Sequence, residues 1–181
     1  LCVDCGACKR VCDFQKKNEN QFGHQVLSAY GAASKNERLI KKSASGGMFA
    51  QLAELFLETG GVVYGAAMLR EDKLRVKHIR VEDKAQFYLI QGSKYIQSDI
   101  DDTYQKVKQD LVKGRQVLFS GTPCQAAALR SFLKKDYENL SVVDIVCHGV
   151  STAQIFQDYI SFLEKKKNIK ITNFAFRDKS V

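Results

Sequence analysis

The 181-residue sequence predicts an α/β fold with a mostly parallel or mixed sheet flanked by helices. Two observations support this fold class. Short apolar stretches of strand length alternate along the chain with longer segments in which apolar residues recur every three or four positions. The composition, 45% hydrophobic and 27% charged residues, is that of an ordinary globular protein that can bury its own core.

In the first half of the chain, polar residues 13–25 are interpreted as a linker into the main domain. Apolar residues at helical spacing predict a helix over 48–59, which Gly60-Gly61 ends. Residues 62–68 are nearly all apolar, as in a strand that is covered on both faces. The other expected elements are a first strand at 26–33, a more polar strand at 74–81 and a short helix from about Asp83.

In the second half, Asp101-Asp102 is a natural helix start and Gly114 closes that helix. A short buried strand at 117–119, a helix after Pro123 and a strand at 141–146 then form a β-α-β unit. The remaining expected elements are an amphipathic helix around 155–163 and a last strand at 169–176.

Four cysteines at the start of the chain have the spacing of the bacterial ferredoxin run, C-x2-C-x2-C-x3-C. Such short gaps let the backbone wrap around one face of a cluster, and Gly6 and Ala7 leave room for that approach. Asp13 stands where such runs usually have proline. We therefore interpret residues 1–20 as a ferredoxin-like 4Fe–4S segment, ahead of an α/β domain at 21–181, with Cys2, Cys5, Cys8 and Cys12 as ligands.

Other interpretations of the cysteine run stay open at this point. A zinc site usually takes its ligands from two separated pairs, unlike this tight quartet. In two-cluster ferredoxins the fourth cysteine of such a run serves the other cluster, so Cys12 belongs either with the first three or with a second cluster. Six cysteines, four of them in a ligand-type run, argue against a disulfide scaffold and predict a reducing, cytoplasmic environment.

The formal net charge is +8. Part of this excess can balance anionic cofactors, and the rest suits an acidic redox partner or substrate. Nucleic acid is not expected as a partner, because the Lys and Arg residues are spread out and no reading motif accompanies them. No apolar run reaches the roughly 18 residues of a membrane span. The chain opens with Leu1 inside a motif, so we expect a fragment of a longer polypeptide.

Two further cysteines follow the strands of the β-α-β unit. Cys124 comes after the strand at 117–119, and Cys147 comes after the strand at 141–146. Because ligands bind at the carboxyl edge of open α/β sheets, we expect both thiols at one functional rim. Two inert buried thiols are the alternative, since free cysteine packs as a small hydrophobe. Two cysteines cannot hold a cubane alone, so a second cluster needs further ligands.

Two loops combine glycines with hydroxyl groups. Ser43-Ala-Ser-Gly-Gly47 precedes a helix and can present backbone N–H groups to phosphate, although serine there is also an ordinary N-cap. Gly92-Ser-Lys-Tyr-Ile-Gln-Ser98 offers a cation and an aromatic ring to a phosphate or flavin. Neither loop matches G-x-G-x-x-G or the Walker motif. His148 is a candidate proton carrier, whereas His24 and His78 give no signal.

Taken together, four motifs behind the cysteine run resemble the coenzyme F420 hydrogenase/dehydrogenase beta-subunit family, which also includes 7-hydroxymethyl chlorophyll a reductase. The motifs are Ser43-Ala-Ser-Gly-Gly47, Gly92-Ser-Lys-Tyr95, Gly121-Thr-Pro-Cys-Gln125 and Asp144-Ile-Val-Cys-His-Gly149. The resemblance implies an FAD-binding iron–sulfur oxidoreductase that moves electrons between ferredoxin or clusters and a two-electron carrier or organic substrate. It implies a cofactor site formed by Ser43, Ser45, Gly46, Gly47, Gly92, Lys94, Tyr95, Gly121 and Thr122.

The resemblance also implies that Cys124 and Cys147 ligate a second 4Fe–4S cluster, completed in relatives by a later C-x2-C pair. No such pair occurs up to Val181, which is a departure from the family pattern. Two other functions are kept as alternatives: a non-catalytic electron-transfer subunit of a larger redox complex, and a zinc-stabilised binding domain.

Overall fold

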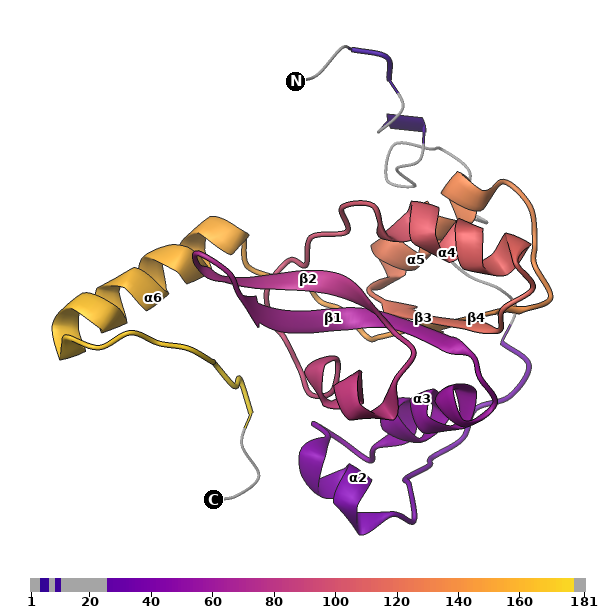
Figure 1. Ribbon diagram of the computed structural model, residues 1–181, viewed down its shortest axis with the longest axis horizontal. Coiled ribbons are helices and arrows are strands. Elements are labelled where there is room, and N and C mark those ends of the chain that lie inside the picture. The colour runs from indigo at the N-terminus through magenta and orange to yellow at the C-terminus, as the bar shows by residue number, and fades with distance from the viewer. Residues whose placement is uncertain (1–3, 7–8, 11–25, 178–181) are drawn as a thin grey trace.

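The computed structural model describes residues 4–6, 9–10 and 26–177. At the centre of this part of the chain is a mixed sheet in the order β2-β1-β3-β4 (Figure 1). β1 (Val62–Arg70) and β2 (Leu74–Val81) form an antiparallel hairpin. β3 (Val117–Gly121) runs parallel to β1, and β4 (Leu140–Asp144) runs parallel to β3. The predicted α/β fold class and its β-α-β unit are therefore confirmed.

One face of the sheet is covered by α3 (Met48–Glu58) and the 3-10 helix η2 (Lys84–Leu89), with α2 (Glu37–Lys42) next to them (Figure 1). The N-cap of α3 is Gly47, whose φ of 77° is a left-handed conformation that favours glycine. Apolar side chains from these helices and from the sheet form one core cluster: Leu39, Ala50, Ala53, Leu57, Val63, Ala67, Val81, Phe87, Ile90 and Leu118.

The opposite face is covered by α4 (Thr103–Val112) and α5 (Pro123–Leu133). Pro123 suits the first position of α5, because the missing N–H would have no partner inside the helix. Alternate residues of β1 point to the two faces, so Val63 joins the first cluster whereas Tyr64 joins the second. The second cluster consists of Val62, Tyr64, Val107, Leu111, Val117, Phe119, Leu129 and Leu133.

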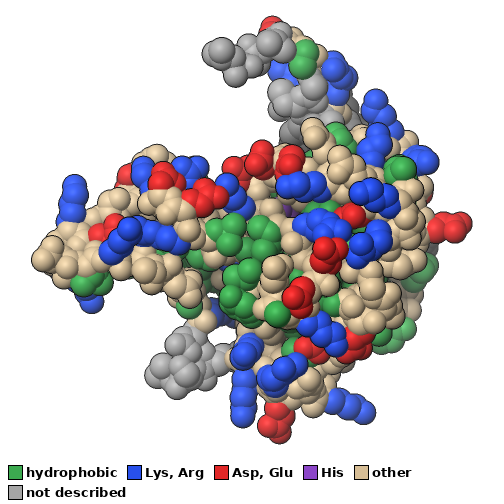
Figure 2. All heavy atoms as spheres, viewed as in Figure 1, with side chains coloured by type: hydrophobic (Ala, Val, Ile, Leu, Met, Phe, Trp, Pro, Cys, Tyr) green, Lys and Arg blue, Asp and Glu red, His purple; other side chains and the backbone are tan. Residues whose placement is uncertain are grey.

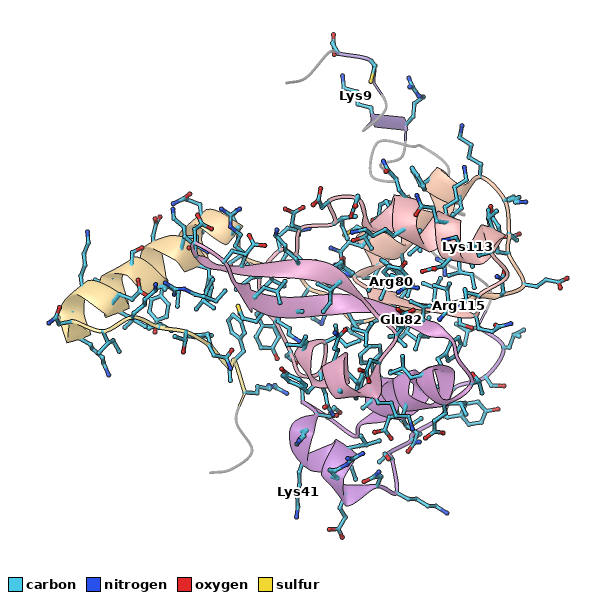
Figure 3. All side chains as sticks on the ribbon, viewed as in Figure 1. Lys9, Lys41, Arg80, Glu82, Lys113 and Arg115 are labelled. Atoms are coloured by element: carbon cyan, nitrogen blue, oxygen red, sulfur yellow. The ribbon has the colours of Figure 1, made fainter. Side chains whose placement is uncertain are left out.

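A charged network ties β1 and β2 to α4 on this second face. The Tyr64 hydroxyl donates to Oδ2 of Asp110 at 2.6 Å, and Arg80 donates to both Asp110 oxygens at 2.7 and 3.1 Å. Arg80 also pairs with Glu82 at 2.9 Å, and Glu82 lies 3.4 Å from Arg115 (Figure 3). The buried Asp110 carboxylate is thus satisfied by a cation and a phenol, which is what burying a charge requires.

α6 (Ala153–Lys167) extends past the end of the β1–β2 hairpin (Figure 1). Phe156 and Ile160 of α6 pack on Leu74 and Val76 of β2 in a third apolar cluster, which residues 169–177 extend through aromatic rings. Figure 2 shows hydrophobic side chains gathered over β1 beside α6. Among the described helices, none has the length and hydrophobicity to cross a membrane.

Two strand predictions were wrong, and one helix was missed. Residues 26–33 are not a strand: Val26, Leu27 and Tyr30 are 79–91% exposed and no sheet edge pairs with them. Residues 169–176 are not a strand either, because their aromatic side chains pack on the third cluster without backbone pairing to the sheet. The polar segment before Ser43 contains α2, whose N-cap is the Asn36 side chain.

Candidate functional site

A cavity of about 580 Å³ lies at the carboxyl ends of β3 and β4, the edge at which open α/β sheets bind ligands. Its volume is within the roughly 300–1,000 Å³ of small-molecule pockets. Four loops that are far apart in sequence line it, at 43–47, 90–98, 120–122 and 145–150. Ten of the residues singled out from the sequence meet there: Ser43, Ser45, Gly46, Gly47, Gly92, Lys94, Tyr95, Gly121, Thr122 and Cys147.

The loop at 43–47 is fixed against the extended segment before α2. The Ser34 N–H donates to the Gly46 carbonyl at 2.7 Å, and the Ser34 hydroxyl donates to the Gln51 side chain at 2.8 Å. A Cβ added to Gly46 would lie 3.0 Å from the Ala32 carbonyl oxygen. Glycine is therefore needed here for close packing of two backbones, in addition to any contact with a ligand.

The loop at 92–98 forms the neighbouring wall. Backbone pairing between Ile96 and Ser151 joins it to the loop after β4, and the Ser151 hydroxyl donates to the Tyr95 carbonyl at 3.2 Å. The Lys94 ammonium donates to the carbonyls of Leu89 and Gln91 at 3.2 and 2.8 Å. Burial of Lys94 lowers the pKa of its ammonium to about 8.

A buried hydrogen-bonded chain runs through the wall formed by β2, the loop at 92–98 and α5. Nε2 of His78 is 3.0 Å from the Ser120 carbonyl, which can only accept, so Nε2 carries the proton. Nδ1 therefore accepts from Ser98 at 2.9 Å, and the Ser98 hydroxyl accepts in turn from the Gln125 amide at 2.8 Å. Burial lowers the pKa of His78, which keeps the ring neutral.

His78, Ser98 and Gln125 line the cavity. Ser98 and Gln125 are the last residues of two motifs quoted from the sequence, but neither they nor His78 were assigned a role there. The hydrogen-bond partners of His78 lie 20 and 42 residues along the chain. Ser98 and Ser120 reach His78 only when β2 has paired with β1 and the loop at 92–98 lies next to β2. A histidine inside a polar strand pattern carries no local signal of such a network.

The floor and the rim of the cavity are apolar. Gly65 of β1 lies against Ile90, whose side chain would be 3.2 Å from a Cβ at that position. Gly92 and Gly149 have positive φ angles, and a Cβ on either would meet no atom within 4 Å. Open space beside these glycines suits a planar ligand that approaches the backbone closely. Exposed apolar residues surround the mouth: Met48, Tyr95, Ile145, Val146 and Val150.

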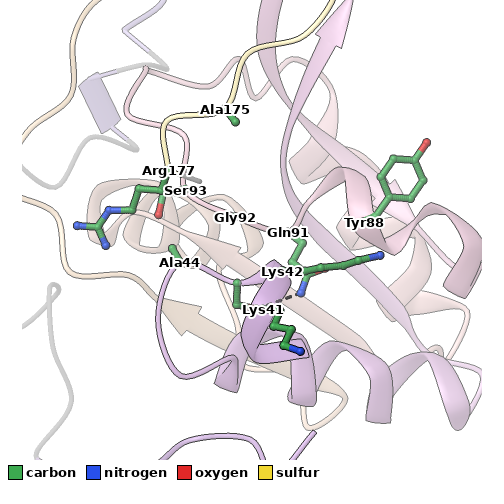
Figure 4. Close-up of a pocket in the computed structure, with 10 residues that line it drawn as sticks. Lys41, Lys42, Ala44, Tyr88, Gln91, Gly92, Ser93, Ala175 and Arg177 are labelled. Carbon is green, nitrogen blue, oxygen red and sulfur yellow. Dashed lines mark hydrogen bonds between the residues drawn. The ribbon is translucent and has the colours of Figure 1, made fainter. Parts of the chain in front are cut away.

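A second cavity of about 410 Å³ adjoins the first and shares Ser43, Ala44, Gln91, Gly92 and Ser93 with it. The Gln91 amide donates to the Ser43 hydroxyl at 3.0 Å between the two (Figure 4). Lys41 and Lys42 from the end of α2 and Arg177 from the C-terminal tail line this basic compartment. Within residues 26–177, no Asp or Glu lines either cavity.

The cysteines are placed differently from one another. Cys2, Cys8 and Cys12 lie outside the described residues, and Cys5 is exposed. Cys147 lines the main cavity, whereas Cys124 lies at the start of α5, where its Sγ is 3.1 Å from the Thr122 hydroxyl. Both follow carboxyl ends of neighbouring parallel strands, at one edge of the sheet. Within the described ranges, no three His, Cys, Asp or Glu side chains are grouped as metal ligands.

The chain matches two family models. Residues 29–103 match the N-terminal model of the coenzyme F420 hydrogenase/dehydrogenase beta subunit, and residues 114–181 match the C-terminal model. Comparison with curated protein sequences gives no match.

A solved structure of the F420-reducing NiFe hydrogenase complex from Methanosarcina barkeri contains a chain of similar fold. The two folds superpose with a TM-score of 0.54 and 20% sequence identity. The match covers 75% of this chain and 48% of the hydrogenase chain, so this chain spans about half of that chain's length. The two family models together cover most of the sequence and agree with the motifs it carries. The chain belongs to the coenzyme F420 hydrogenase/dehydrogenase beta-subunit family.

Proposed function

We propose that this chain is the flavin-binding part of an FAD- and 4Fe–4S-dependent oxidoreductase. It would move electrons between ferredoxin, or the cluster of its own cysteine run, and a two-electron carrier or organic substrate. The observation that carries the proposal is the meeting of nine candidate cofactor residues, from three separate loops, around one cavity. FAD, when bound, supplies the ability to take up electrons singly or in pairs.

The residues around the two cavities fit an anionic dinucleotide with a flat aromatic ring. The apolar floor at Gly65 and Ile90 suits the ring, and the basic compartment at Lys41, Lys42 and Arg177 suits phosphates. The part of the chain that the structure describes contributes lysines and an arginine but no carboxylate to the two linings, which favours a ligand with negative charge.

The described residues offer Cys124 and Cys147 but no third ligand for a second cluster, so we derive no electron-transfer step through one. The cluster of Cys2, Cys5, Cys8 and Cys12 remains a prediction from spacing, as does the division of the chain at residue 20. The protein of similar fold is part of a multi-subunit complex, which favours a second candidate function. In that case the chain is an electron-transfer subunit that hands electrons to a partner.

Anaerobic purification tests the proposal. We expect a yellow-brown protein that releases FAD on denaturation and shows iron–sulfur signals by paramagnetic resonance. Ala44→Trp adds bulk between the two compartments and is expected to prevent FAD binding. Ala153→Trp is the matched control, because it places the same bulk on the exposed start of α6. A colourless wild-type protein that holds zinc contradicts the proposal.

A further inference from the structure

The main cavity contains one side chain with a formal charge. Among the described residues that line it, Lys94 is the only Lys, Arg, Asp or Glu. Apart from Lys94, its titratable lining residues are His78, Tyr95, Cys147 and His148. A partly buried cation with no carboxylate beside it among the described residues is unusual, because isolated charges are costly to remove from water unless a ligand or partner compensates them.

The Lys94 ammonium is held in a fixed position. It donates to the carbonyls of Leu89 and Gln91, at the end of η2, and no ion pair found among the described residues includes it. An ammonium has three N–H donors, so these two bonds leave one for a ligand in the cavity. Because the two carbonyls already orient the group, it needs no rearrangement to meet negative charge on that ligand.

We propose that Lys94 is the counter-charge for the flavin ring, stabilising the ring in its reduced state. This inference rests on the proposed FAD binding. Two electrons, from a cluster or ferredoxin, and one proton from solvent leave the ring with one negative charge. Lys94 supplies the matching positive charge at the ring rather than at the phosphates.

The placement of the other cations distinguishes the ring from the phosphates. Lys41, Lys42 and Arg177 are in the basic compartment and can meet phosphates, whose charge is permanent. Lys94 is partly buried and bonds the carbonyls on either side of the buried Ile90, in the apolar compartment where a flat ring fits. A charge that appears only on reduction is best matched by a group whose protonation can change near neutral pH, and burial puts the pKa of Lys94 at about 8.

The test compares Lys94→Met with wild-type FAD-loaded protein, using the midpoint potential of the flavin and the Kd of oxidised and reduced FAD. Removing the charge is expected to raise the Kd of reduced FAD about tenfold more than the Kd of oxidised FAD. This difference equals a fall of about 30 mV in the two-electron midpoint potential. Lys94→Gln keeps hydrogen-bond donors without the charge and should shift the potential in the same direction. Lys165→Met, at the exposed end of α6 and away from both cavities, is the control and should leave the potential unchanged.

The wild-type protein provides a second measurement that needs no variant. Above the pKa of Lys94, reduction should take up two protons instead of one, so the fall of the potential with pH steepens, and both Lys94 variants should lack this change. Equal loss of oxidised and reduced FAD binding, or an unchanged potential, overturns the inference while leaving FAD binding intact as a function. Wild-type protein that binds no flavin overturns the proposed function and this inference with it.

Discussion

The Tyr64 hydroxyl donates a 2.6 Å hydrogen bond to Oδ2 of Asp110, and thereby joins the central strand β1 to α4. Tyr64 is fully buried, and the residue after it, Gly65, lines the main cavity on the other face. The same strand thus carries a polar anchor on one face and the floor of the site on the other. Because hydrogen bonds to charged groups are among the stronger ones, this contact is a suitable place to probe how the sheet supports the cavity.

Tyr64→Phe should lower the free energy of unfolding by about 1.5–3 kcal/mol, because a buried carboxylate loses a donor while the ring stays in place. Urea denaturation followed by circular dichroism measures the change. Tyr30→Phe is the control, because Tyr30 is exposed and its loss should cost less than about 0.5 kcal/mol. Equal effects of the two substitutions would show that the phenol of Tyr64 adds nothing.

Asp110 should make the stability of the protein sensitive to acid. Burial raises the pKa of Asp110, but the hydrogen bonds from Arg80 and Tyr64 outweigh it and hold the pKa below the ordinary value of 3.8. The resulting stability is present above that value and is lost as the pH falls through the lower, folded pKa. Denaturation between pH 5 and about pH 2 should therefore show a steeper loss for wild type than for Asp110→Asn. Parallel curves would contradict this assignment.

His78 should be neutral and protonated on Nε2 at pH 7. Burial lowers the pKa of His78 in the folded protein, so unfolding takes up a proton once the pH falls below the ordinary value of 6.5. The neutral ring contributes stability above that pH, and this contribution is lost on acidification. Nitrogen-15 spectra of the imidazole measure both tautomer and titration. A protonated Nδ1 at pH 7 would contradict the hydrogen-bond directions assigned to Ser98 and Ser120.

Gly47→Ala should destabilise the start of α3 by about 1–2 kcal/mol, because the φ of 77° is a left-handed conformation that costs a Cβ this much. It should also weaken FAD binding, since the loop at 43–47 lines the cavity. Gly31→Ala is the matched control: its Cβ would meet nothing within 4 Å, and its φ is not positive. Thermal melts and flavin titrations of both variants provide the measurements. Unchanged FAD affinity in a folded Gly47→Ala protein would remove this loop from the site.

The basic compartment should recognise phosphate groups. Replacing Lys41, Lys42 and Arg177 together by Met should weaken the binding of FAD by about tenfold or more. The binding of riboflavin, which has no phosphate, should be nearly unchanged. The control replaces Lys165, Lys166 and Lys167, at the end of α6, and removes the same charge elsewhere. Equal weakening of FAD by the two triple variants would indicate a long-range charge effect without a local site.

Sequence patterns predicted the helices and strands whose formation depends mainly on residues within or next to the same segment. The nearly all-apolar β1, the Gly60-Gly61 end of α3 and the Pro123 start of α5 were predicted with bounds close to those observed. Residues 26–33 and 169–176 have apolar residues at strand-like positions, but pairing depends on a free sheet edge, which the sequence does not reveal. In residues 169–176, the ring of Phe174 packs against Phe156 and Tyr159 of α6 instead.

The site was predicted unevenly for the same reason. Glycine- and serine-rich loops such as 43–47 are visible as loops, and the family resemblance indicated which of them matter. The chain from His78 through Ser98 to Gln125 was not found, because each member is unremarkable in its own segment and the network exists only in three dimensions. The sequence indicated Lys94 as a site residue, but only the structure shows that none of the described carboxylates lines the cavity with it.

The four loops around the main cavity adjoin different elements: those at 120–122 and 145–150 lie at the ends of β3 and β4, that at 43–47 lies between α2 and α3, and that at 90–98 follows η2. No single segment can therefore form the cavity before the sheet and its helices have come together. Occupancy and global folding are therefore thermodynamically linked. A ligand at about 100 times its Kd would add about 2.7 kcal/mol to the unfolding free energy. Cells that run short of this ligand would accumulate chains that unfold more often, and proteolysis would then remove the empty protein ahead of the loaded one.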